Sequence, residues 1–186
     1  MVVHRRCGAW MSRPWWTAAI LRRIPDSIVV PFDTQAFDVK VDPSDSILSL
    51  ADRLAKYGVG GTDGSMPIQK ANAAYAMRTF AGVLLVSDNE SWVYQGRPYF
   101  YGVGGSTGVV TKWQQFVQNQ VRFQSGDIVG PKLICIDLQP NATTPAPERS
   151  DILNVGGFSD AVFEVISTFL VSDTGRFVAE IEAVML

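Results

Sequence analysis

The 186-residue sequence contains little cysteine and almost no histidine. Its two cysteines, Cys7 and Cys135, are too few for a disulfide framework, which favours a reducing, cytoplasmic location. The single histidine, His4, leaves no residues for a histidine-based catalytic triad or a histidine-ligated zinc site. No hydrophobic run approaches the ~20 residues that a membrane-spanning helix requires, so we expect no membrane association.

Acidic residues are missing from the N-terminus and abundant elsewhere. Residues 1–24 contain five arginines and no acidic residue, which leaves 11 basic and 18 acidic residues, a net charge of −7, in the rest of the chain. A domain with this net negative charge offers no basic surface to DNA or RNA, so we expect neither to bind this chain strongly. The length and the 47% hydrophobic content suit one sizeable core and therefore a single domain.

Strand-like and helix-like hydrophobic patterns alternate from residue 17 onward. The ranges that resemble strands are 27–32, 37–41, 82–86, 132–138 and 152–155, and those that resemble helices are 17–23, 44–54, 65–79, 109–121, 159–169 and 176–186. Hydrophobic and charged residues alternate over 37–41, as in a half-exposed edge strand of a hairpin. The order predicts a three-layer α/β sandwich whose sheet is mostly parallel with one antiparallel edge strand.

Two short loops carry candidate ligands for a hard cation. Thr62 and Asp63 end a glycine-rich loop before a predicted helix, and Asp88 follows a continuous hydrophobic strand. A hydroxyl and a strand-end carboxylate at one edge of an α/β sheet are oxygen ligands of the kind that Mg²⁺ prefers. The alternative is that Thr62 and Asp63 cap the helix and Asp88 caps a turn.

None of the remaining motifs predicts an enzyme active site. Asp173-Thr-Gly175 matches the tripeptide of aspartic proteases, but such a dyad requires a second carboxylate in a β-rich fold. The glycine-rich residues 102–108 lack the lysine of a phosphate-binding loop. Aromatic residues between positions 92 and 101 could stack on bases, although packing on the domain explains them equally well.

Four motifs in chain order resemble one known family. They are Gly60-Gly-Thr-Asp63, Val86-Ser-Asp-Asn-Glu-Ser-Trp92, Cys135-Ile-Asp-Leu-Gln-Pro140 and Asn154-Val-Gly-Gly-Phe-Ser159. Together they resemble the von Willebrand factor A-type domain of TROVE-domain proteins, the Ro autoantigen family, over about residues 17–172. The resemblance implies a Rossmann-like A-type sandwich that follows a ring of helical repeats. Proteins of this family bind small structured and misfolded RNA, mainly through the ring.

The resemblance also implies a metal-ion-dependent adhesion site in the A-type domain. The family builds it from an Asp-x-Ser-x-Ser loop after the first strand, a threonine and a strand-end aspartate. The last two correspond to Thr62 and Asp88, with Asp63 as a helix cap or a supporting acid, and the ion would be Mg²⁺ or a similar cation. No Asp-x-Ser-x-Ser occurs in this chain, so two of five expected ligands remain. This departure predicts that the first, central strand is also missing.

Residues 1–16 are an atypical segment rich in tryptophan and arginine. The DNA that encodes Trp10-Met11 contains an aspartate codon in another frame, which leads to the hypothesis that residues 1–16 are an out-of-frame product and residues 17–186 the A-type domain. The alternative is a genuine, divergent N-terminus. A sheet without its central strand would leave buried backbone groups unpaired, at about 1–3 kcal/mol each, and the isolated chain is then expected to be poorly soluble and insensitive to Mg²⁺.

The sequence thus predicts the non-enzymatic C-terminal domain of a Ro-type cytoplasmic ribonucleoprotein, with an incomplete metal site. Its expected partner is a small structured RNA, bound through a helical-repeat ring that this chain lacks. The alternative is a module that binds a protein ligand at the metal-bearing edge and has no role with RNA.

Overall fold

The structure, a computed structural model, describes most of the chain. The described residues are 2–5, 12–57, 62–76, 78–87, 93–94, 97–98, 107–122, 130–137, 146–147, 149–157, 159 and 161–171. The candidate ligand Asp88, the glycine-rich residues 102–108 except the last two, the motif at Asp173 and the predicted helix at 176–186 lie outside these residues.

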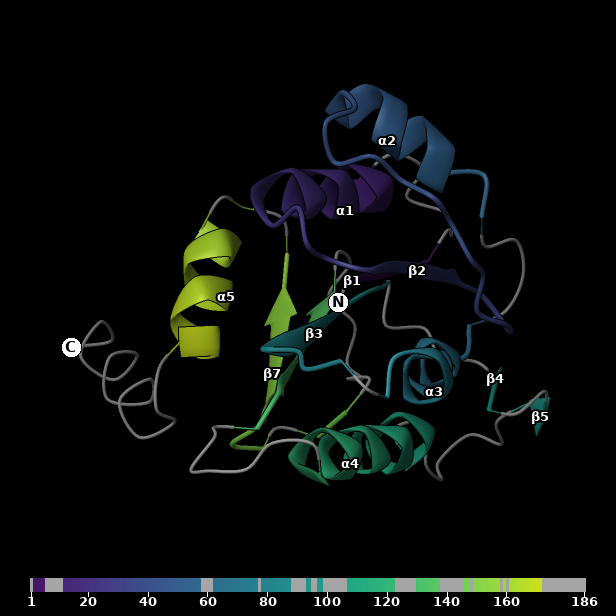
Figure 1. The fold of residues 1–186 in the computed structure, drawn as a ribbon, viewed down its shortest axis with the longest axis vertical. Coiled ribbons are helices and arrows are strands. Elements are labelled where there is room, and N and C mark those ends of the chain that lie inside the picture. The colour runs from purple at the N-terminus through teal and green to yellow at the C-terminus, as the bar shows by residue number, and fades with distance from the viewer. Residues whose placement is uncertain are drawn as a thin grey trace.

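A parallel sheet lies at the centre of the described residues (Figure 1). Its spatial order is β2-β1-β3-β6-β7, and every neighbouring pair in it is parallel. The strands are β1 (Val2–Arg5), β2 (Val29–Phe32), β3 (Gly82–Ser87), β6 (Lys132–Asp137) and β7 (Ile152–Gly156). A separate two-stranded hairpin joins β4 (Val93–Tyr94) to β5 (Arg97–Pro98).

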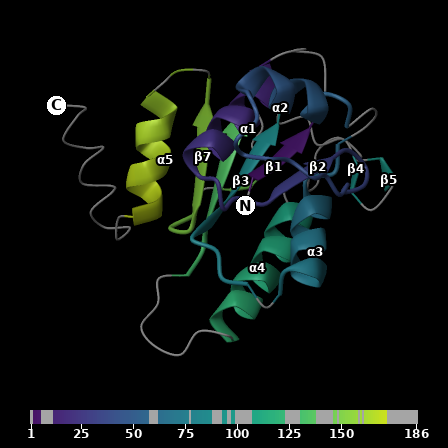
Figure 2. The same cartoon turned by 45° about the horizontal axis from the view of Figure 1, so that its top comes forward.

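Helices cover both faces of the sheet, which confirms the predicted three-layer α/β sandwich (Figures 1 and 2). The helices are α1 (Ser12–Arg23), α2 (Ile47–Leu54), α3 (Ser65–Ala74), α4 (Thr107–Arg122) and α5 (Ala161–Val171). One hydrophobic core joins α1, α2 and α5 to one face, and a second core joins α3 and α4 to the other. Strands β3 and β6 are buried at every position because both of their faces are covered, as their continuous hydrophobic sequences predict.

The first strand of the sheet, β1, is present as an inner strand, so the prediction that it is missing is wrong. β1 pairs in parallel with β2 on one side and β3 on the other. The backbone groups of β2 and β3 therefore have partners, and the predicted penalty for unpaired groups does not arise. Trp16 of α1 is buried and stacks on Phe163 of α5 at 4.4 Å between ring centroids. Part of the 1–16 segment thus belongs to the same fold as the rest, while its out-of-frame origin stays a hypothesis.

The predicted antiparallel edge strand at 37–41 does not form. Its antiparallel contact is reduced to a bridge between Phe32 and Ala36 and a bond from the Phe37 N–H to the Pro31 carbonyl (2.8 Å). Val39 and Val41 pack at the margin of the first core, which accounts for the alternating pattern without strand pairing. A partly buried side chain on every second residue therefore reflects core contact here, rather than membership of the sheet.

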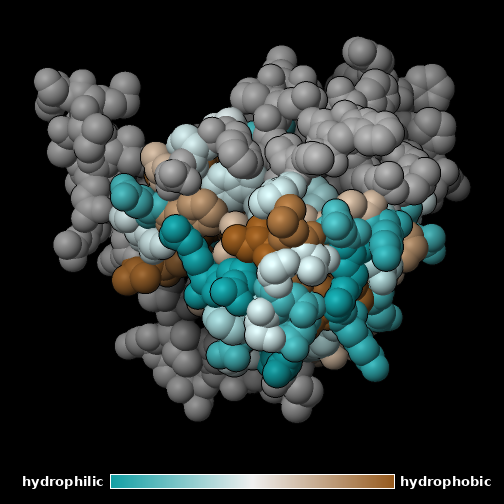
Figure 3. All heavy atoms as spheres, turned by 90° about the horizontal axis from the view of Figure 1, so that it is seen from above, coloured by the Kyte–Doolittle hydropathy of each residue, from teal (hydrophilic) through white to brown (hydrophobic). Residues whose placement is uncertain are grey.

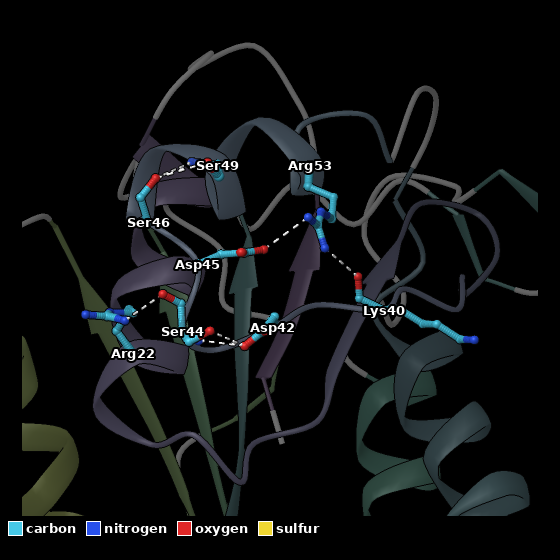
Figure 4. A network of polar contacts seen from close by, with 8 residues as sticks. All are labelled: Arg22, Lys40, Asp42, Ser44, Asp45, Ser46, Ser49 and Arg53. Atoms are coloured by element: carbon cyan, nitrogen blue, oxygen red, sulfur yellow. Dashed lines mark hydrogen bonds and ion pairs between the residues drawn. The ribbon is translucent and has the colours of Figure 1, made fainter.

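Helix α2 begins later than its predicted cap. The carboxylate of Asp42 accepts bonds from the N–H (2.8 Å) and the hydroxyl (2.7 Å) of Ser44, and these bonds lower the pKa of this exposed group (Figure 4). Asp42 thus forms a local turn. The N-cap is Ser46, whose hydroxyl accepts a bond from the N–H of Ser49 at 3.1 Å.

Candidate functional site

Buried polar residues gather at the carboxyl-terminal edge of the sheet. Six of the nine buried polar or charged residues in the described part of the chain lie at this edge: Asp33, Thr62, Asp63, Ser65, Ser87 and Asp137. Three of them follow or end strands, and the other three lie at the start of α3. We call this group the carboxyl rim. It includes both described members of the predicted site, in the position where open α/β sheets bind ligands.

Asp63 has the geometry of a helix-start residue. Its carboxylate accepts bonds from the N–H (3.0 Å) and the hydroxyl (2.6 Å) of Ser65, the first residue of α3. Its own N–H donates to the carbonyl of Asp33 at 2.9 Å, which ties the start of α3 to the end of β2. The carboxylate thus satisfies one of the N–H groups that the helix itself leaves without partners.

Asp33 has a comparable local role at the end of β2. Its carboxylate accepts the N–H of Gln35 at 2.9 Å and so forms the tight turn that follows the strand. Asp137 ends β6, and its carbonyl accepts the N–H of Gly157 at 2.8 Å. Gly157 has a φ of 98°, which favours glycine, and it belongs to the motif Asn154-Val-Gly-Gly-Phe-Ser159. This motif therefore forms the turn after β7 and places that turn next to the rim.

The candidate ligands are only partly brought together. Thr62 is 2% exposed and makes a further interaction, as do Asp63, Ser87 and Asp137. Asp88 would follow β3 directly, but it lies outside the described residues. Sequence reasoning missed Asp33 as a member of the rim and assigned Asp137 no place in it. Their common signal is a position at the end of a predicted strand, which becomes a shared site only once the strand order is known.

The described rim does not fit a complete magnesium site. Among the described residues, no three His, Cys, Asp or Glu side chains are arranged to hold an ion. Asp33 and Asp63 each direct a carboxylate oxygen to their own turn. Residues 6–11, between β1 and α1, contain neither a carboxylate nor a hydroxyl group, whereas Mg²⁺ demands near-ideal octahedral coordination by oxygen.

The face that carries α1 and α2 is mixed, with hydrophobic patches among hydrophilic side chains (Figure 3), and its sequence is not basic. Outside the buried Asp33, residues 14–57 contain five basic and five acidic residues. Arg22 donates to the carbonyl of Pro43 (3.1 Å), and Arg53 binds both the carbonyl of Lys40 (3.1 Å) and the carboxylate of Asp45 (3.0 Å; Figure 4). Both arginines thus hold a loop of the domain itself, and this face offers no field of one sign to a phosphate backbone.

None of the described helices is long and hydrophobic enough to cross a membrane. No protein-family model matches the sequence. The chain is 28% identical over 151 residues to the RNA-binding protein RO60 of Deinococcus radiodurans, which covers 80% of this chain and 24% of that protein. It therefore spans about a quarter of the length of this curated relative.

A solved structure shows the same fold. The crystal structure of the Deinococcus radiodurans Ro (RSR) protein superposes with a TM-score of 0.67 and 23% sequence identity, over 91% of this chain and 33% of that one. The chain is thus similar in sequence to one Ro protein and shares its α/β fold with a solved Ro structure, which supports the resemblance carried by the four motifs.

Proposed function

We propose that this chain is the non-enzymatic A-type domain of a cytoplasmic Ro-type ribonucleoprotein. The observation that carries the proposal is the similarity to RNA-binding protein RO60 over 80% of the chain, together with the shared fold. The described part of the rim supports a binding role over catalysis, because its carboxylates serve turns and a helix start.

In this proposal RNA is bound mainly outside the chain, through a ring of helical repeats. Two observations support this division. The chain from residue 25 onward has 11 basic and 18 acidic residues, and the described arginines of the α1–α2 face hold its own loops. A small structured RNA remains the expected partner. The isolated chain is expected to bind RNA no more tightly than the roughly 10⁻⁴–10⁻⁶ M of non-specific binding.

The metal site of the proposal is incomplete. Thr62 and Asp88 are the residual ligands, and two oxygen ligands leave most of the coordination of Mg²⁺ to water. An ion held in this way would have a coordination position free for an acidic group of a partner. Because the chain offers so few ligands, we expect its association with partners to persist without divalent cations.

The decisive experiment is a purification of the tagged protein from its own cells, with and without nuclease and with and without EDTA. The proposal expects a defined small RNA to co-purify in EDTA and any bound protein to be lost after nuclease treatment. The control is the isolated chain mixed with the same RNA, which is expected to bind it no more tightly than an unrelated RNA.

The second candidate is a protein-interaction module that uses the rim and never contacts RNA. The buried hydroxyl of Thr62, at the edge where such domains bind ligands, favours this candidate. A protein partner that survives nuclease treatment and dissociates in EDTA would establish it and contradict the RNA proposal.

A further inference from the structure

The two edges of the sheet differ in how they are protected. β2 forms one edge and β7 forms the other. On the β2 edge, Pro31 has no N–H group, and its carbonyl accepts the N–H of Phe37 at 2.8 Å. A proline and a chain that folds back along the strand both block the addition of a further strand. Any strand added to this sheet is therefore expected at β7.

The hydrogen bonds to β6 show which backbone groups of β7 face outward. The carbonyl of Asp151 accepts the N–H of Leu133, and the N–H of Gly157 donates to the carbonyl of Asp137, both at 2.8 Å. Residues of a strand face its neighbour alternately, so the odd-numbered residues from 151 to 157 face β6. The N–H and C=O groups of residues 152, 154 and 156 therefore face away from β6.

Only part of this outer edge is occupied by described residues. Ile152 is covered by Arg149, which accepts its N–H at 3.0 Å and donates to its carbonyl at 3.3 Å. For the outward backbone groups of Asn154 and Gly156, the described part of the chain provides no partner. Residues 152–157 also contain no charged residue and no proline, the usual protection of an exposed edge. The open part of the edge is thus residues 154–156.

This open part is complementary to a second copy of itself. A two-fold axis at Val155 places Asn154 of each copy opposite Gly156 of the other. In an antiparallel pair, two opposed residues of this kind exchange two N–H···O bonds, so the two copies form four bonds. Val155 at the axis faces β6 and needs no partner, and Gly156 has no side chain to obstruct Asn154. The pairing uses the same groups that have no described partner.

Helix α5 provides a second, independent observation on the same side of the domain. It lies beside β7 (Figures 1 and 2), and Glu164 is its one charged residue. Its buried residues are Val162, Ile166 and Phe169, yet Val165 and Leu170 are only partly buried and Val171 is 88% exposed. A helix that is hydrophobic on more than one face is usually covered on more than one face. The two-fold pairing places the α5 helices of both copies side by side on one face of a continuous sheet.

We propose that the edge of β7 is a self-association surface, on which a second copy of this chain adds its own β7 in antiparallel orientation about Val155. The interface is isologous, because the same residues of both copies form it. It comprises the four backbone bonds and the outer side of α5. This inference does not rest on the proposed role with RNA, so either can fail while the other stands.

Sedimentation equilibrium of the unmodified 186-residue chain gives the first test. The proposal expects a reversible monomer–dimer equilibrium with a Kd between about 1 µM and 1 mM, as suits a small interface. A single monomeric species up to about 1 mM overturns the proposal.

Gly156→Pro tests whether this edge forms the dimer. The N–H of Gly156 faces away from β6, so proline removes two of the four intermolecular bonds without breaking the bonds between β6 and β7. The Kd is expected to rise at least about tenfold, while the Tm of the monomer stays within about 3 °C. Gly156→Ala keeps the N–H and is the matched control, expected to dimerise as the unmodified chain does. A folded Gly156→Pro variant with an unchanged Kd overturns the proposal.

Amide hydrogen exchange of the unmodified chain gives a result even if Gly156→Pro does not fold. The amides of Asn154 and Gly156 are expected to exchange slowly above the Kd and rapidly below it. The amide of Leu153, which faces β6, is the internal control and exchanges slowly at both concentrations. Slow exchange of Asn154 and Gly156 at both concentrations shows that the chain covers its own edge, and rapid exchange at both shows that nothing does. Either result overturns the proposal.

Discussion

The buried amide of Gln120 permits a sharp test of how the second core is assembled. Gln120 lies on α4 and is 1% exposed. Its carbonyl oxygen accepts the N–H of Phe80 at 3.0 Å, and its amide donates to the carbonyl of Arg78 at 2.8 Å. These two bonds fix the turn between the end of α3 and the start of β3. They also explain why α3 ends at Ala74 rather than near residue 79, as the sequence predicts.

Gln120→Leu removes both bonds and leaves two backbone groups to find water. Phe80 is half-buried and Arg78 is exposed, so each lost bond is expected to cost about 1 kcal/mol rather than the larger penalty of a fully buried group. The total of about 2–3 kcal/mol corresponds to a fall in Tm of about 4–12 °C for a chain of this size. Urea unfolding followed by tryptophan fluorescence and a thermal melt measure the two quantities.

Gln120→Glu refines the test through pH. The new carboxylate still accepts the Phe80 N–H, but it meets the carbonyl of Arg78 without a donor. At low pH the protonated carboxyl donates as the amide does. The difference in stability between this variant and the unmodified chain therefore becomes smaller as the pH falls. Gln118→Glu, exposed on the same helix, is the control. Equal effects at positions 118 and 120 refute the reasoning.

Three further results are expected. Thr17→Val raises the stability by about 1 kcal/mol in urea unfolding, because the buried hydroxyl of Thr17 has no hydrogen-bond partner in the described part of the chain; a loss of stability would mean that a partner exists. Gly82→Ala lowers the stability by about 1–3 kcal/mol, since a Cβ would lie 2.8 Å from the backbone carbonyl of Lys132 and 2.5 Å from the side chain of Leu170; an unchanged Tm would contradict this close packing. Burial raises the pKa of Cys135 to about 12, so its thiol is expected to resist a disulfide reagent at pH 8 until the chain unfolds. Rapid labelling of this cysteine in a Cys7→Ser variant would contradict its burial.

The predictable parts of the fold are those whose pattern is set by local burial. Strands β3 and β6 are covered on both faces, and this alone produces their continuous hydrophobic sequences. Helix α4 likewise follows from its hydrophobic spacing, with Val109, Trp113 and Phe116 in the second core. The end of α3 was not predictable, because the bonds that stop it come from Gln120, about 40 residues away in the chain.

Strand β1 was missed for a different reason. It has four residues, two of which are His4 and Arg5, so neither its length nor its composition marks it as a central strand. Its position depends on pairing with β2 and β3, which supply the backbone partners on both sides. The resemblance implies a first strand followed by an acidic loop, and residues 6–11 after β1 contain no acidic residue that would mark the strand.

The same distinction governs the carboxyl rim. The sequence predicted Thr62 and Asp63 as rim residues because short motifs mark the start of a helix. Asp33 and Asp137 join them only through the order of the strands, which no local pattern contains.

The carboxylates of the rim also show why a family motif does not by itself establish a metal site. Asp63 is needed at the start of α3 and Asp33 in the turn after β2, whether or not an ion is bound nearby. Both residues therefore have a structural role in this chain, whose residues 6–11 after β1 contain no acidic residue. The motifs around Asp63 and Asp137 therefore indicate the α/β architecture, and metal binding has to be judged from the loop that follows β1.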